Sequence, residues 1–150
     1  MQELSAGNVV DGDFPPYTPD GSHYHNCLEI GLCLSGDGMV EMAGSSWRFS
    51  EGTLLMVPKG VYHAQHNAGE PFTHWRYIAV DSDRLLTQAP HWCAKAIREA
   101  MQTTWHSGLY LPPGDEDGAR AASIIHTMFD LERSGGNVLP ELEAYLILLM

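Results

Sequence analysis

The chain has 150 residues, 44% of them hydrophobic, which suits a single domain with a substantial core. Its formal net charge is −11 and its eight lysines and arginines are scattered, so this chain is not expected to bind nucleic acid by itself. We expect neither a signal peptide nor a transmembrane segment. Cys27 and Cys33 would lie about 20 Å apart on one strand, too far for a disulfide, which favours a reduced, cytoplasmic protein.

Residues 1–80 contain short apolar runs separated by turn residues. The runs have the length of β-strands and recur at nearly even intervals. This pattern predicts an antiparallel sandwich or barrel over residues 1–80. We predict strands at residues 28–34, 38–42, 46–49, 53–57, 62–66 and 74–80.

Residues 81–150 change to a helical pattern. The sequence predicts a short helix at residues 92–101, an isolated strand at 109–111 and a longer helix that begins near residue 115. Acidic residues 115–117 suit the start of that helix because they complement its macrodipole. Its apolar face recurs at three- and four-residue spacing through Ala122, Ile125, Met128 and Phe129.

A second amphipathic helix is predicted from Pro140, because proline favours the first turn of a helix. The chain reaches Met150 inside this helix without a capping residue, so we expect it to be a piece of a longer protein. Leucines recur along the helix at the spacing of a packing seam, which makes it the candidate dimerisation helix. These leucines are Leu139, Leu142, Leu146 and Leu149.

Two spaced motifs, about forty residues apart, carry the chemistry of the chain. The first reads H-x-H-x3-E-x6-G and contains His23, His25, Glu29 and Gly36. The second reads G-x5-P-x-G-x2-H-x3-N and supplies a third imidazole. Its residues are Gly52, Pro58, Gly60, His63 and Asn67.

The motifs together provide three imidazoles and one carboxylate. If the first motif lies on one strand, His23, His25 and Glu29 point to the same face, and His63 must come from a neighbouring strand. Such a ligand set suits Zn, Fe, Mn, Ni or Cu and does not choose among them. The competing interpretation is a pocket lined by these polar groups without a metal. His66 has the opposite parity to His63, so we expect it to face outward.

Large aromatic and sulfur-containing side chains on the predicted strands are candidates for lining a ligand pocket. Ordinary core packing is the competing interpretation for each of them. Trp47 and Trp75 are the strongest candidates, because an indole at a barrel mouth can stack on a ring of a ligand. The candidate pocket residues are Trp47, Met56, Tyr62, Trp75 and Tyr77.

The stretch from His23 to Asn67 resembles the two signature motifs of the cupin superfamily. This resemblance implies a mainly β fold, the double-stranded β-helix barrel or jelly roll, over residues 1–80. It also implies that a divalent metal would be held by His23, His25, Glu29 and His63. Cupins include enzymes, storage proteins and sensors, so the resemblance alone does not give a function.

The runs EIGLCLSGDG from Glu29 and WRFSEGTLLMVPKGVYH from Trp47 are similar to the N-terminal sensor domains of AraC-type bacterial transcriptional regulators. In that family the barrel is followed by helices that form the dimer contact and lead into helix-turn-helix modules that bind DNA. The resemblance implies the same role for the helices of residues 81–150. Sequence for the DNA-binding modules is not present in these 150 residues.

Two functions of different classes remain open. In the first, the chain binds a small-molecule effector through a metal-containing barrel and forms a homodimer. In the second, it is a cupin metalloenzyme, similar to a dioxygenase or an isomerase, and Tyr62 is then the only general acid or base that the sequence nominates. The helical tail and the acidic charge favour the first function, with no catalytic residue assigned. A purely structural cupin is the third interpretation.

Overall fold

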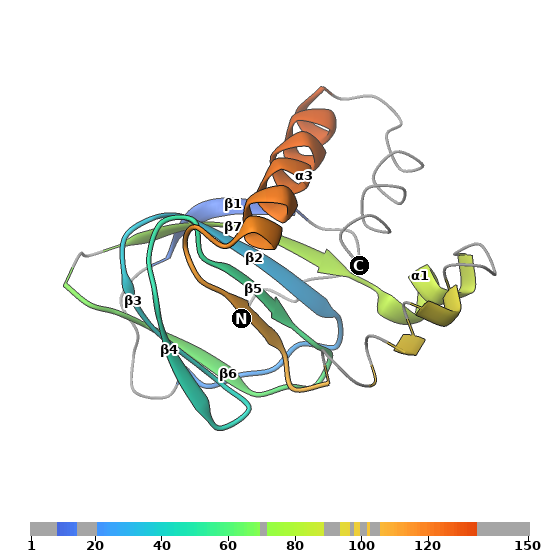
Figure 1. Ribbon diagram of the computed structural model, residues 1–150, viewed down its shortest axis with the longest axis horizontal. Coiled ribbons are helices and arrows are strands. Elements are labelled where there is room, and N and C mark those ends of the chain that lie inside the picture. Colours follow the sequence, from blue (N-terminus) through green and yellow to red (C-terminus); the bar gives the residue numbers. More distant parts are fainter. Residues whose placement is uncertain are drawn as a thin grey trace.

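The computed structural model shows two antiparallel β-sheets with a long helix packed on one of them (Figure 1). This arrangement confirms the prediction of a mainly β fold followed by a helix. The structure describes residues 9–14, 21–69, 72–88, 94–96, 98–99, 102 and 106–134.

The larger sheet has five strands in the order β1-β7-β2-β5-β8. All its pairings are antiparallel, and β2 lies at its centre between β7 and β5. β2 is buried along most of its length because the second sheet covers one face and a helix covers the other. The strands are β1 (Val9–Phe14), β2 (Leu28–Ser35), β5 (Leu54–Val57), β7 (Thr73–Val80) and β8 (Leu109–Leu111).

The smaller sheet has three strands in the order β4-β3-β6. Glycines with positive φ occupy the turns around these strands, as the sequence predicted for Gly36, Gly52 and Gly60, and Pro58 ends β5. The six strands predicted before residue 81 are present within one residue of their predicted bounds. The strands of this sheet are β3 (Gly38–Met42), β4 (Ser45–Phe49) and β6 (His63–Asn67).

Helix α3 (Glu116–Arg133) covers the outer face of the five-stranded sheet (Figure 1). Asp115 caps its N-terminus, since its Oδ1 accepts a hydrogen bond from the backbone N–H of Gly118 at 2.9 Å. On the same face, Arg76 of β7 lies 4.8 Å from the Phe129 ring centroid, and its Nη1 is 2.6 Å from His126 Nδ1. These polar and cation–π contacts supplement the apolar packing of α3.

The five-stranded sheet separates two hydrophobic cores. We call the core between the two sheets the inter-sheet core and the core under α3 the helix-side core. Alternate residues of β2 enter opposite cores, as the period of two for a strand requires. The inter-sheet core contains Cys33, Val40, Phe49, Leu55, Trp75 and Tyr77. The helix-side core contains Leu28, Ile30, Leu32, Leu54, Met56, Ile78, Val80, Ile125, Met128 and Phe129.

Several elements differ from the sequence-based expectations or lie outside the described ranges. Strand β1 and helix α1 (Ser82–Gln88) were not predicted. Described residues of the predicted helix at 92–101 are helical. The predicted helix from Pro140, with Leu139, Leu142, Leu146 and Leu149, lies outside the described residues. Among the helices that are described, none is long and apolar enough to cross a membrane.

Replacing Ile125 by alanine tests the helix-side core. Ile125 is 0% exposed, so we expect Ile125→Ala to lower the free energy of unfolding by about 2–4 kcal/mol through lost burial and a residual cavity. Chemical denaturation followed by circular dichroism measures this loss. Ser123→Ala, an exposed position on the same helix, should change the free energy of unfolding by less than about 0.5 kcal/mol. Equal losses in both variants would contradict this packing.

Candidate metal centre

The candidate site lies where the chain crosses from the three-stranded sheet to the five-stranded sheet. His23 pairs with His63, the first residue of β6, in an isolated antiparallel bridge. Each of the two residues donates its backbone N–H to the carbonyl of the other, at 3.0 and 2.9 Å. The chain then enters β2 at Leu28, in the other sheet. The segment between these points carries His25 across one end of the sandwich.

Three imidazoles meet at this crossing. His23, His25 and His63 each offer a ligand atom, and these atoms lie within 4.8 Å of one another. The ring centroids are 4.3 Å apart for His23 and His63, 4.8 Å for His23 and His25, and 5.2 Å for His25 and His63. His63 is buried, whereas His23 and His25 are half-buried, so solvent reaches the cluster from the side of the crossing segment.

The Glu29 carboxylate lies against two of these rings. Its Oε2 is 3.0 Å from His25 Nε2, and its Oε1 is 3.6 Å from His63 Nε2. Glu29 is only 6% exposed and faces the space between the sheets, where it is paired in register with Val57 and Ala79. A buried carboxylate requires compensation by positive charge or by hydrogen bonds. A cation between Glu29 and the imidazoles would supply it.

Backbone carbonyls set the tautomers of two of the histidines. His23 Nδ1 lies 2.8 Å from the Gly21 carbonyl oxygen, and His63 Nδ1 lies 3.2 Å from that of Val61. A carbonyl oxygen can only accept, so Nδ1 carries the hydrogen in both rings and Nε2 keeps its lone pair. Metal-binding histidines are commonly oriented by such a hydrogen bond from the other ring nitrogen.

The third imidazole also has a nitrogen that suits a metal. His25 Nε2 is buried, and no described group forms a hydrogen bond of good geometry with it, although Glu29 Oε2 is 3.0 Å away. A buried nitrogen in this state is costly unless another species satisfies it. The set of three imidazole nitrogens and one carboxylate therefore fits a divalent transition metal such as Zn, Fe, Mn, Ni or Cu.

Burial and the carboxylate shift two histidine pKa values in opposite directions. Burial lowers the pKa of His63, which keeps its ring neutral and able to bind a metal at neutral pH. Contact with Glu29 raises the pKa of His25 by stabilising its protonated form, against an opposing effect of burial. Metal binding competes with protonation of the imidazoles, so metal affinity is expected to fall as the pH falls.

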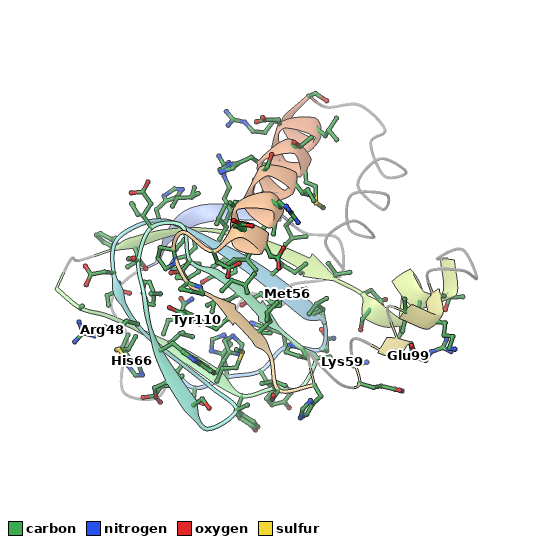
Figure 2. The ribbon with its side chains drawn as sticks, in the orientation of Figure 1. Arg48, Met56, Lys59, His66, Glu99 and Tyr110 are labelled. Carbon is green, nitrogen blue, oxygen red and sulfur yellow. The ribbon has the colours of Figure 1, made fainter. Side chains whose placement is uncertain are left out.

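The turn between β5 and β6 holds the backbone of His25. Gly60 has a φ of 79° and donates its N–H to the His25 carbonyl oxygen at 2.9 Å. The neighbouring Lys59 forms an exposed ion pair with Asp83 of α1, with Nζ 3.0 Å from Oδ2. Figure 2 places Lys59 toward α1, and Arg48 and His66 toward the opposite end of the sandwich. The P-x-G part of the second motif therefore positions a residue of the first motif.

The predicted ligand residues come together, but not from the predicted strand. The sequence placed His23, His25 and Glu29 on one strand, whereas β2 begins at Leu28, after a bend at residues 26–27. His23 belongs instead to the bridge with His63. The expectation for one strand was wrong because the crossing between the sheets interrupts it. Within β2, Glu29 does share its inward face with Cys33.

The five candidate pocket residues lie in different environments. Trp75 and Tyr77 are buried in the inter-sheet core with their rings stacked at 5.5 Å. Trp47 packs against the same core and stacks on Tyr110 at 5.4 Å. Met56, labelled in Figure 2, belongs to the helix-side core under α3.

Tyr62 differs from the other four candidates because it is 61% exposed and contacts Tyr24 at 5.0 Å. Tyr24 follows His23, and Tyr62 precedes His63, in the paired segments. Because neighbouring residues of a strand face opposite sides, both tyrosines point away from the imidazole cluster. Met56 and Tyr62 therefore do not lie with Trp47, Trp75 and Tyr77 between the sheets.

A polar pair that the sequence analysis did not identify lies inside the sandwich. The Tyr77 hydroxyl donates to Gln65 Oε1 at 2.9 Å. Burial is the main cause that raises the pKa of Tyr77 well above its usual value, so this phenol stays protonated and remains a donor. Gln65 lies two residues after His63 on β6, so both side chains face the same side of the strand. That spacing was the one sequence signal that could have placed Gln65 in the interior.

The remaining sulfur and imidazole groups agree with the simpler interpretations. Cys27 and Cys33 are buried and are not joined in a disulfide. Burial raises the pKa of Cys33 to about 12, which makes its thiol unreactive. The ring of His66 is one-third exposed, and its Nε2 lies 3.7 Å from Glu41 Oε1, away from the three clustered histidines.

Comparison with known proteins agrees with the fold. Residues 11–78, slightly less than half of the chain, match the family model of the cupin domain. No curated protein sequence matches the chain.

Several solved structures are similar to this chain at low sequence identity. ToxT from Vibrio cholerae is 10% identical, with a TM-score of 0.52 over 81% of this chain and 48% of that one. A cupin protein from Bacteroides fragilis is 23% identical, with a TM-score of 0.42 over 51% of this chain and 67% of that one. A variant of Bacillus subtilis oxalate decarboxylase is 19% identical, with a TM-score of 0.40 over 61% and 29%. The chain spans about half the length of ToxT, and at 10% identity that likeness concerns the fold alone.

Replacing Gly60 tests whether its turn positions His25. Gly60 and Gly44 both have positive φ, 79° and 81°, and open space where a Cβ would be added, but only Gly60 donates to His25. We expect Gly60→Ala and Gly44→Ala to lose about 1–2 kcal/mol of stability each through backbone strain. Only Gly60→Ala should also weaken the binding of Co²⁺, measured by its visible absorption. Equal Co²⁺ affinities in the two variants would show that the turn does not position the site.

Proposed function

We propose that this chain is the small-molecule effector-binding and dimerisation domain of an AraC-type transcriptional regulator, with a divalent metal in its cupin fold. The observation that carries the proposal is the convergence of three imidazoles with a buried carboxylate at a solvent-accessible end of the sandwich. On a metal that takes six ligands, four protein ligands leave two coordination positions open, and an effector can occupy such a position.

The proposed ligands are the four residues of the two motifs. His23, His25 and His63 would bind through their ring nitrogens, and Glu29 would bind through a carboxylate oxygen. When bound, the metal would act as a Lewis acid toward an oxygen or nitrogen atom of the effector. The chain itself contributes the tautomers of His23 and His63, the buried charge of Glu29 and the apolar walls around them.

The regulatory role draws on features outside the site. Its support is the resemblance of the runs from Glu29 and from Trp47 to AraC-type sensor domains. The likeness to ToxT, which concerns the fold alone, extends over 81% of this chain and so beyond the cupin match. In the proposal, a homodimer forms through the leucine seam of the last predicted helix. DNA would be bound only by helix-turn-helix modules that are not part of these 150 residues. A net charge of −11 suits a half of the protein that does not contact DNA.

A cupin metalloenzyme, such as a dioxygenase or an isomerase, is the second candidate function, because the same open metal site could activate a substrate. Tyr62, the acid or base that the sequence nominated, is 61% exposed and packs against Tyr24. Tyr62 directly precedes His63 and points to the opposite, outward side, so its hydroxyl does not support catalysis at the imidazole cluster. Turnover of a candidate substrate by the metal-loaded protein, lost in His63→Ala, would favour the enzyme.

The metal assignment is tested by elemental analysis of protein purified without a metal-affinity column. We expect about one equivalent of transition metal per chain after loading and dialysis of the wild type, and less than about a tenth in the double variant His25→Ala, His63→Ala, because two of four ligands are removed. The control double variant His66→Ala, His126→Ala removes two imidazoles outside the cluster and should retain the metal. Equally low metal in the wild type and the first variant would refute the site.

The dimer is tested by placing a charge in the leucine seam. We expect Leu142→Glu to shift the sedimentation of the chain from a dimer toward a monomer, because a desolvated carboxylate in an apolar interface is strongly unfavourable. Ser123→Glu, on an exposed position of α3, serves as the control and should leave the mass unchanged. A dimer that persists in Leu142→Glu would remove the seam from the interface.

A further inference from the structure

The hydrogen bond between Tyr77 and Gln65 crosses the sandwich next to the proposed metal centre. Gln65 lies two residues beyond His63 on β6, and both side chains face the space between the sheets. Tyr77 lies on β7, in the opposite sheet, and its hydroxyl reaches Gln65 Oε1 at 2.9 Å. We call this pair the Tyr77–Gln65 bridge. Its Gln65 end is therefore adjacent to a proposed metal ligand.

The Tyr77 end of the bridge is adjacent to a second ligand. The ring of Tyr77 lies over Gly31 on β2, because a Cβ added at Gly31 would be only 2.6 Å from Tyr77 Cε1. Gly31 follows Glu29 by two residues on the same face of β2. A glycine at this position makes room for the tyrosine ring. The Tyr77–Gln65 bridge thus lies beneath Glu29 and His63 together, as the inner wall of the site.

The bridge fixes the orientation of the Gln65 carboxamide. The phenol of Tyr77 donates to Oε1, so the Nε2 amide group, with two N–H donors, is directed away from that contact. Tyr77 is buried, at 6% exposure, whereas Gln65 as a residue is half-buried. An oriented donor beside a metal centre is suited to an acceptor atom of a ligand.

The charge of the site indicates which ligand this donor would meet. Three neutral imidazoles and one carboxylate leave a divalent metal with a net charge of +1. Val57 and Ala79, which flank Glu29 in the five-stranded sheet, are apolar and buried. A single negative charge on a small ligand would neutralise the site, and its oxygen atoms would accept from Gln65.

We propose that Gln65, oriented by Tyr77, is the ligand-recognition residue of this site and that the effector presents a carboxylate to the metal and to the Gln65 amide. The inference rests on the proposed function, because it requires the metal held by the four motif residues. It adds the chemical class of the ligand group and a residue that selects it.

The experiment uses the full 150-residue chain loaded with Co²⁺ and titrated with acetate as the probe. Binding of acetate to the metal changes the visible absorption of Co²⁺, which gives a dissociation constant for acetate in each variant. Co²⁺ affinity and the melting temperature are measured in parallel. These readouts do not depend on any catalytic activity.

Gln65→Glu is the principal variant, because it keeps the size of the side chain and can still accept from Tyr77. We expect it to bind Co²⁺ at least as tightly as the wild type but to bind acetate at least tenfold more weakly. The variant loses a hydrogen bond to a charged group and gains a repulsive charge. Tyr77→Phe should weaken acetate binding by a smaller factor, because Gln65 remains but is no longer oriented.

Two further variants complete the test. Gln65→Met removes the donor without adding a charge, and it should also weaken acetate binding if Gln65→Glu melts too early to be measured. His66→Gln changes the next residue of β6, on the outward face, and should leave the acetate dissociation constant within about twofold of the wild type.

The outcomes separate the inference from the proposed function. A wild-type chain that does not bind Co²⁺ overturns the metal site and the inference with it. A chain that binds Co²⁺ but has the same acetate dissociation constant in wild type, Gln65→Glu and Gln65→Met overturns the inference alone. Failure of acetate to perturb the Co²⁺ spectrum of the wild type overturns it as well.

Discussion

The candidate site depends on one backbone pairing, the reciprocal hydrogen bonds between His23 and His63. This bridge anchors the segment before β2 to the three-stranded sheet, although β2 itself belongs to the five-stranded sheet. The few residues between the two attachments must therefore cross the end of the sandwich, and His25 lies in that crossing. The imidazole cluster and its contact with Glu29 follow from this constraint, and the hydrogen bond from Gly60 secures it on the opposite side.

The polar interior of the sandwich is organised in two connected levels. The outer level holds the imidazoles and Glu29, where carbonyl oxygens set the tautomers of His23 and His63. The inner level is the Tyr77–Gln65 bridge, which joins the two sheets through side chains. Hydrogen bonds restrict the orientation of His23, His63 and Gln65, whereas the buried His25 Nε2 has only its 3.0 Å contact with Glu29. That nitrogen lies where a metal would be bound.

The sequence predicted most strands, because turn glycines, prolines and alternating polarity are local signals. The spacing of the two motifs nominated the four residues that meet at the candidate site. The sequence did not predict the crossing, because pairing of His23 with His63 joins segments forty residues apart. It also could not assign the faces of β5, where apolar residues 54–57 look alike and Met56 proved to point toward α3. The exposure of Tyr62 and the inward direction of Gln65 follow from where β6 begins, because side chains alternate between the two faces of a strand. The sequence did not give that starting residue.

Strand β2 serves two neighbours at once, since Glu29, Gly31 and Cys33 face the second sheet while Leu28, Ile30 and Leu32 face α3. The two faces therefore set different limits on substitution. A change at Glu29 or Gly31 would alter the site, because Glu29 contacts two imidazoles and Gly31 makes room for the Tyr77 ring. A change at the leucines or isoleucine of the other face would instead disturb the attachment of α3, provided that the register of the strand is kept.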